Sequence, residues 1–265
     1  MAIQDLFGQE LRAVNIGLED FAASLEDQGA EAVHVDWRPP LEGYVELTHT
    51  PDGKEIDAIN AEAVERIRTG RPLLIGMDIA KNVIPGMGER MILHAGPPIE
   101  WERMCGPQRG AVMGAAVYEG WADSYEEAEE MAAAGEFEFD PCHHHHTVGP
   151  MAGITSPSMP VFLVKNKTFG NVVYATQNEG LGRVLRYGAY GDDVIERLKW
   201  MDETLYPALK RALEHTGPID LRSIIAQALH MGDEVHNRNR AATSLLIRKL
   251  APALVETSEK EAAKE

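Results

Sequence analysis

The sequence has few of the features that would cross-link the chain or attach it to a membrane. It contains only two cysteines, Cys105 and Cys142, which form no CxxC pair. This argues against a disulfide framework, and we expect Cys142 to be a small packing residue rather than a nucleophile. No apolar run approaches the roughly 18 residues of a membrane-spanning helix. The N-terminus, MAIQDLFGQE, has no signal-peptide pattern. We therefore predict a cytoplasmic protein without membrane contact.

Basic charge is also scarce. The chain has 25 lysines and arginines against 42 aspartates and glutamates, which gives a formal net charge of −17. Nucleic acids and anionic membranes are bound through basic patches, so this balance argues against both as partners. The first strand-helix-strand pattern has the turn IGLE in place of GxGxxG. A nicotinamide dehydrogenase is therefore a distant alternative, and we predict no cofactor.

The apolar periodicity predicts a fold class that mixes α/β and α+β structure. Strands are expected at 12–17, 32–37, 72–77, 91–94, 136–140, 160–165 and 171–175, with the last two forming a hairpin. Helices are expected at 18–28, 56–69, 124–134, 193–215, 220–231 and 240–254. The helix at 124–134 begins at Ser124, with Glu127 in the capping-box position. The region 103–121 is expected to be partly helical, with Gly110 and Gly114 allowing close backbone approach.

These elements predict a Rossmann-like N-terminal layer, a middle α+β region and a C-terminal helical block. A guide of roughly 150 residues per domain suggests about two domains. Composition divides the chain more finely. The predicted segments are a Rossmann-like α/β domain at 1–100, an α+β domain with a His-rich loop at 101–190, a helical domain at 191–255 and a charged tail at 256–265.

The stretch from Pro141 to Pro160 combines four prolines, two glycines and a run of four histidines. We expect an irregular loop, in which Gly149 and Gly153 permit positive φ. A metal site could combine histidines of this run with ligands from His230, Asp233, Glu234 and His236. However, adjacent histidines of an extended run point to opposite faces, and HMGDEVH lacks the His-Glu-x-x-His spacing. No bound metal is predicted, and a metal-dependent amide hydrolase stays an alternative.

An anion site accounts better for the arginines. Gly180 and Gly182 are expected to open a helix that presents Arg183 and Arg186, so that guanidinium and free N–H groups converge on a phosphate or carboxylate. A second donor cluster, at 237–240, lies at another predicted helix start. The alternative is that these arginines, with Arg238, only form ion pairs with neighbouring acids such as Glu179, Asp233 and Glu234.

Several long motifs carry a resemblance to a known family. They are HVDWRPP, LHAGPPIEWERMCGP, PCHHHHTVGPMAGITSPSMPV, NEGLGRVLRYGA and QALHMGDEVHNRN. The sequence resembles the YlbE-like, AllG-type family across nearly its whole length. The resemblance implies a subunit of oxamate carbamoyltransferase, which in allantoin degradation converts oxalurate and phosphate to oxamate and carbamoyl phosphate. It implies an FdrA-like subunit and a third small subunit as partners. Family members usually continue into a second α/β half. The resemblance therefore implies either a natural split version, with a separate chain that supplies the family's C-terminal half as a further partner, or a fragment.

The resemblance and the residue chemistry together predict a pocket for a small anionic substrate. The residues expected to be catalytic are His144 and His230. Those expected to bind substrate are His94, His143, His145, Asn178, Glu179, Arg183, Arg186, His236 and Arg238. A non-catalytic assembly subunit for the FdrA-like partner is the first alternative.

Overall fold

The computed structural model describes residues 12–38, 48–149, 152–177, 179–180, 182–236 and 239–256. Asn178, Arg238 and the predicted charged tail, apart from Glu256, lie outside the described residues. The chain forms two compact units, Met1–Val64 and Glu65–Glu265, which are described separately. The finer division into four segments stays a prediction.

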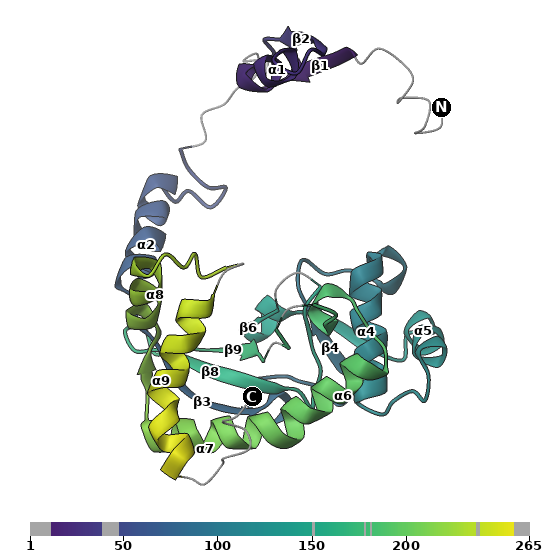
Figure 1. The fold of residues 1–265 in the computed structure, drawn as a ribbon, viewed down its shortest axis with the longest axis vertical. Helices are drawn as coiled ribbons and strands as arrows, with labels where there is room; N and C mark the ends of the chain where they lie inside the picture. The colour runs from purple at the N-terminus through teal and green to yellow at the C-terminus, as the bar shows by residue number, and fades with distance from the viewer. Residues whose placement is uncertain are drawn as a thin grey trace. The chain divides into compact units, whose positions relative to one another are not determined.

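The first unit contains the strand-helix-strand pattern that the sequence predicts. Its elements are β1 (Arg12–Ile16), α1 (Glu19–Glu26) and β2 (Glu31–Val35). The two strands are parallel, and their register runs from Arg12 opposite Glu31 to Ile16 opposite Val35 (Figure 1). The helix α2 (Ile56–Thr69) has the predicted bounds and contains the boundary between the units. The Rossmann-like character of this layer stays a prediction.

Two sheets organise the second unit. Its strands are β3 (Pro72–Ile79), β4 (Met91–His94), β5 (Glu138–Pro141), β6 (Thr147–Val148), β7 (Ile154–Thr155), β8 (Pro160–Asn166), β9 (Val172–Thr176) and β10 (Ile219–Asp220). One sheet has the order β10-β3-β8-β9-β6, and the other has the order β5-β4-β7. The β8 and β9 strands form the predicted antiparallel hairpin. The mixed fold class is thereby confirmed.

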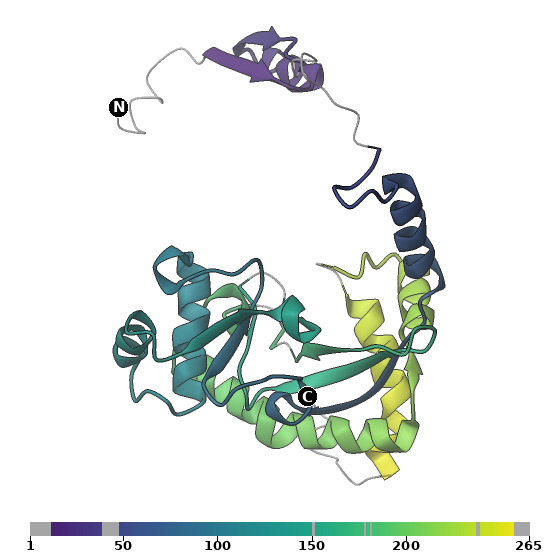
Figure 2. The same ribbon diagram turned by 180° about the vertical axis from the view of Figure 1, so that it is seen from behind.

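Helices pack on both sheets. They are α3 (Ala80–Val83), α4 (Gly106–Tyr118), α5 (Tyr125–Ala133), α6 (Asp192–Trp200), α7 (Tyr206–Thr216), α8 (Leu221–His230) and α9 (Arg240–Glu256). At the start of α5 the Ser124 hydroxyl accepts a hydrogen bond from the Glu127 N–H at 3.1 Å, which confirms the predicted cap. A π-helical turn, Met201–Leu205, joins α6 to α7. These three segments follow one another in a line from the α4 side to the α9 side (Figures 1 and 2).

Separate clusters of buried side chains lie along that line. The first places Val112 of α4 and Leu198 of α6 with Ile92 of β4. The second places Leu213 of α7 with β3, α8 and α9. A smaller cluster brings together apolar side chains from α3, β4 and β8 with Cys142, which follows β5. Each cluster removes apolar area from water, which is the main favourable term in folding.

Helix α4 lies unusually close to the chain at 184–190. A Cβ added at Gly110 would collide with the Gly188 carbonyl oxygen, and one added at Gly114 would collide with the Leu185 side chain. Gly188 itself has a φ of 82°, and a Cβ there would collide with the Pro107 backbone. The predicted close approach is therefore confirmed. It fixes a 3-10 turn, Leu185–Tyr187, against α4.

We predict that Gly110→Ala lowers the free energy of unfolding by about 1–3 kcal/mol, because the added methyl group overpacks a contact between two backbones. Gly106→Ala is the matched control, since a Cβ at Gly106 meets no atom within 4 Å. Its effect should stay within about 0.5 kcal/mol. Urea unfolding of both variants measures the difference. Equal stabilities would show that the backbone contact is looser than described.

Candidate functional site

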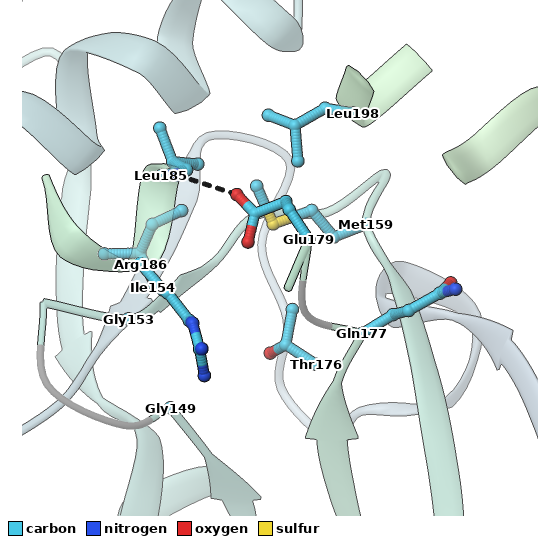
Figure 3. A pocket seen from close by; sticks show the side chains of 10 residues that line it. All are labelled: Gly149, Gly153, Ile154, Met159, Thr176, Gln177, Glu179, Leu185, Arg186 and Leu198. Carbon is cyan, nitrogen blue, oxygen red and sulfur yellow. Dashed lines mark hydrogen bonds between the residues drawn. The ribbon is translucent and has the colours of Figure 1, made fainter. Parts of the chain in front are cut away.

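A small cavity lies where the ends of β7 and β9 meet the turn at Leu185–Tyr187. Its lining consists of Gly149, Gly153, Ile154, Met159, Thr176, Gln177, Glu179, Leu185, Arg186 and Leu198 (Figure 3). Its volume is about 20 Å³. A water molecule needs roughly 10–15 Å³ on this measure, so the cavity admits only a water or the end of a ligand.

Glu179 and Arg186 are the charged side chains of the lining. One Glu179 carboxylate oxygen accepts a hydrogen bond from the Leu185 N–H at 2.8 Å. The Nη2 group of Arg186 donates to the Gly180 carbonyl at 2.9 Å and to the Tyr187 hydroxyl at 3.1 Å. Its Nε–H is buried and has no partner in the described part of the chain. Figure 3 shows the guanidinium group pointing between Gly149 and Thr176.

The helix predicted to open at Gly180 and Gly182 is absent from the described structure of this segment, so that prediction was wrong. The two glycines have φ values of 93° and 100°, which an α-helix does not accept. As a result, Arg183 and Arg186 do not converge. The Arg183 side chain is 69% exposed and lies 3.7 Å from the Asp193 carboxylate, whereas Arg186 turns toward the cavity.

The histidine run forms a 3-10 turn, Cys142–His145, rather than the extended segment assumed from the sequence. The turn places two imidazoles on one carboxylate. Asp140 lies 2.9 Å from Nδ1 of His144 and 2.7 Å from Nε2 of His145. Burial raises the pKa of Asp140, but the hydrogen bonds with the two histidines outweigh it, and the pKa lies below its ordinary value.

His145 is held from both sides. Its Nδ1 lies 2.7 Å from the Pro85 carbonyl oxygen, and its Nε2 faces the Asp140 carboxylate. Both neighbours accept hydrogen bonds, so both ring nitrogens donate only when the ring is an imidazolium. The side chain is buried, with 8% of its surface exposed. This arrangement ties the start of the loop to the chain at Pro85.

The other predicted histidines lie elsewhere. His94 of β4 is fully buried, with Nδ1 3.0 Å from the Ala95 carbonyl oxygen and Nε2 without a partner among the described residues. His143 is exposed, and its ring lies 4.6 Å from that of His144. His230 and His236 are exposed at and beyond the end of α8. No histidine in the described part of the chain lines the small cavity, and the roles of these residues stay predictions.

The remaining ligand candidates have structural partners. The Asp233 carboxylate accepts hydrogen bonds from the N–H groups of Ala241 and Ala242, at 2.8 and 3.1 Å, in the first turn of α9. Burial raises the pKa of the Cys142 thiol to about 12, which fits the expected packing residue. In the described ranges no group of three or more His, Cys, Asp or Glu side chains is arranged to hold a metal ion.

Other parts of the cavity carried no signal in the sequence. The Thr176 hydroxyl makes a short hydrogen bond with the Thr155 hydroxyl, a pairing that depends on strands from two different sheets. Gly149 and Gly153 could adopt positive φ, but neither is among the glycines that do. A Cβ at position 149 would lie 3.0 Å from the Gly153 carbonyl oxygen, so the backbone at Gly153 would have to shift slightly to admit a side chain. The backbone at Gly149 and the backbone at Gly153 therefore lie close together at the cavity wall.

A second cavity shares Arg186 with the first. It has a volume of about 310 Å³ and is lined by Cys105, Pro107, Gln108, Ala152, Arg186 and Tyr187. Arg186 therefore lines both the small cavity and the larger neighbouring one. No helix in the described ranges is long and apolar enough to cross a membrane.

These features define a mixed α/β protein with an arginine-centred pocket built on loops. Residues 137–265 match the family of the oxamate carbamoyltransferase subunit AllG. This match and the relatives below support an AllG-type family member. It is 47% identical over 197 residues to the oxamate carbamoyltransferase subunit AllG of Escherichia coli, a match that covers 74% of this chain and 47% of AllG.

Two further relatives extend the match. The chain is 48% identical over 260 residues to YahG, an uncharacterised protein of Escherichia coli, and this match covers 96% of this chain and 55% of YahG. It also resembles the crystal structure of a conserved protein of unknown function from Enterococcus faecalis, with a TM-score of 0.73 and 50% identity, covering 76% of this chain and 48% of that one. The chain thus spans about half the length of these relatives.

We predict that Asp140→Asn destabilises the protein by about 1 kcal/mol at neutral pH, because the His144 and His145 hydrogen bonds lose their charged acceptor. The folded-state pKa of Asp140 is lowered. The stabilisation is therefore present above the ordinary carboxyl pKa and is lost as the pH falls through the lower, folded-state value.

The two proteins should accordingly become equally stable in strong acid, as measured by urea unfolding across a pH series. The control is Glu136→Gln, which removes an exposed ion pair with Arg90 at 3.4 Å and should have a smaller effect. A difference that persisted unchanged to the lowest pH would contradict an ionised Asp140 as its source.

Proposed function

We propose that the chain is a subunit of a carbamoyltransferase complex acting on small anionic ureides, with oxalurate and phosphate giving oxamate and carbamoyl phosphate. The match with the AllG-type family supports this reaction. The structural observation that carries the proposal is the Arg186 guanidinium, whose buried Nε–H lacks a partner among the described residues at a small cavity. A positioned donor of this kind suits an oxygen that gains negative charge during acyl transfer.

The reaction sets definite demands on the site. A phosphate oxygen attacks the carbamoyl carbon, the bond from that carbon to the oxamate nitrogen breaks, and the departing nitrogen takes up a proton. In this proposal Arg186 stabilises the oxygen of the carbamoyl group. His144 or His230 supplies the proton, and Arg183 and Arg238 bind the anionic groups. The protein carries a net charge of −17, which on average repels anions. Arginines at the site are therefore needed to attract an anionic substrate.

The partners are part of the proposal. The chain spans about half the length of its relatives, and in this proposal the complete site includes the counterpart of their remaining half. An FdrA-like subunit and a third small subunit complete the complex. The family is that of a subunit, which supports a role within a larger assembly.

A second candidate is a non-catalytic assembly subunit for the FdrA-like partner, which the description of the family as that of a subunit also supports. In that case the arginine pocket would stabilise an interface, and the partner would carry the chemistry. Activity of this chain alone would exclude the assembly role. Activity of a complex that is insensitive to substitution of Arg186 would favour it.

We predict that Arg186→Gln lowers kcat/KM for oxalurate phosphorolysis by the reconstituted complex by about 100-fold or more, the usual cost of losing one oxyanion donor. Arg186→Lys should recover only part of the loss, because an ammonium group lacks the planar fork. The control is Arg90→Gln, which removes an exposed surface cation and should leave the rate unchanged. Carbamoyl phosphate formation is the measured quantity. A wild-type rate for Arg186→Gln would refute the proposed role.

A further inference from the structure

The small cavity contains hydrogen-bonding groups of opposite kinds. Arg186 contributes a buried N–H donor without a partner in the described structure. Glu179 contributes a carboxylate, of which one oxygen is occupied by the Leu185 N–H. In Figure 3 the other Glu179 oxygen points toward the interior of the pocket, while the Gln177 side chain points away from Arg186. The cavity therefore offers a donor on one wall and a charged acceptor on another.

These two groups do not neutralise each other directly. The ion pairs within 4.0 Å that the described residues form include Arg183 with Asp193, but none joins Glu179 to Arg186. The space between them is what a ligand could occupy. A carboxylate placed there would accept from Arg186 but would face the Glu179 oxygen as a second negative acceptor. The negative charges of the ligand carboxylate and of Glu179 would repel each other, so a fully anionic group fits the cavity poorly.

A carbamoyl group, in which one carbon carries both a carbonyl oxygen and an amide nitrogen, matches both walls. Its oxygen accepts a hydrogen bond, and its amide nitrogen donates two. Its size also suits a cavity of about 20 Å³, which admits the end of a molecule and excludes its bulk. The larger cavity of about 310 Å³ beside Arg186 has room for the rest of such a molecule.

We propose that the small cavity binds the neutral carbamoyl end of the substrate, with its oxygen on the Arg186 Nε–H and its amide nitrogen on the free oxygen of Glu179. The assignment rests on the proposed function and adds an orientation to it. The anionic end of the substrate lies outside the small cavity, on the side of the larger one. Glu179 is in this view the specificity-determining residue, because it rejects a carboxylate where it accepts an amide.

The test compares oxamate with oxalate, two planar molecules of similar size that differ by the exchange of an amide for a carboxylate. Dissociation constants are measured by isothermal titration with the assembled complex and, in parallel, with this chain. The wild-type protein should bind oxamate at least about tenfold more tightly than oxalate, a difference of about 1.4 kcal/mol. Acetamide and acetate form a second pair that lacks the additional carboxylate.

Substitution of Glu179 gives the decisive comparison. In Glu179→Gln the side-chain oxygen can still accept from the Leu185 N–H, while the new amide nitrogen faces the cavity. Oxalate binding should strengthen and oxamate binding should weaken, so the preference should disappear or reverse. Glu129→Gln, on the exposed face of α5, is the matched control and should keep the wild-type preference. A merely structural role of Glu179 would weaken both ligands together.

Each other outcome overturns the assignment. Equal binding of oxamate and oxalate by the wild-type protein, or a preference that Glu179→Gln leaves unchanged, would show that the cavity does not select an amide. Failure of both ligands to bind would show that it holds a buried water only. If the assignment of the subsite is refuted but carbamoyl transfer still requires Arg186, the proposed reaction is retained. A Glu179-dependent preference in a complex without carbamoyl transfer would instead retain the subsite and refute the reaction.

Discussion

The backbone contact between α4 and the turn at Leu185–Tyr187 is the constraint on which the site depends. Gly110 and Gly188 carry no side chains that could separate the two segments, and a Cβ at either position would collide with backbone atoms. The turn is held from its other side by the bond between the Glu179 carboxylate and the Leu185 N–H. Arg186 therefore projects from a backbone whose position is set by α4, a helix that lies within the main buried cluster. Packing, rather than a neighbouring acid, decides where this cation lies.

The charged groups of the histidine turn and of the turn at Leu185–Tyr187 have different roles. The histidine turn is directed at Asp140, so its imidazoles satisfy a carboxylate and anchor the loop. Arg186 instead keeps a donor unpaired, within the described structure, at a cavity. The net charge of −17 does not cancel that donor, because exposed charges beyond a Debye length of about 8 Å are largely screened. Affinity for a small polar ligand is consequently a local property of the few groups that line the pocket.

Periodicity was sufficient for regular elements and insufficient for the loops. The helix at 56–69 and the strand at 91–94 have the predicted bounds. The strand is buried at all four positions, whereas the helix has no buried residue, so the apolar spacing located the helix without revealing what its apolar face contacts. Glu179 and Arg186, both predicted to bind substrate, line the small cavity, and that role stays a prediction. The prediction of a helix at Gly180 was wrong because Gly180 adopts a positive φ. Glycine permits this conformation, but its presence in a sequence does not predict it. The shape of the histidine turn depends on Pro85, which is 60 residues away in the chain and leaves no trace in the local pattern.

The π-helical turn between α6 and α7 sets how α7 is rotated about its axis relative to α6. It therefore decides which buried cluster each helix faces. Leu198 on one side of it faces the cluster around α4, and Leu213 on the other faces the cluster around β3. A π turn accommodates one residue more than an α-helical path of the same kind. Each residue of an α-helix rotates its successor by about 100°, so a one-residue deletion at Met201–Leu205 would turn α7 away from its own cluster while α6 kept its place. Insertions and deletions are thus far less tolerable in this helix than its continuous outline suggests.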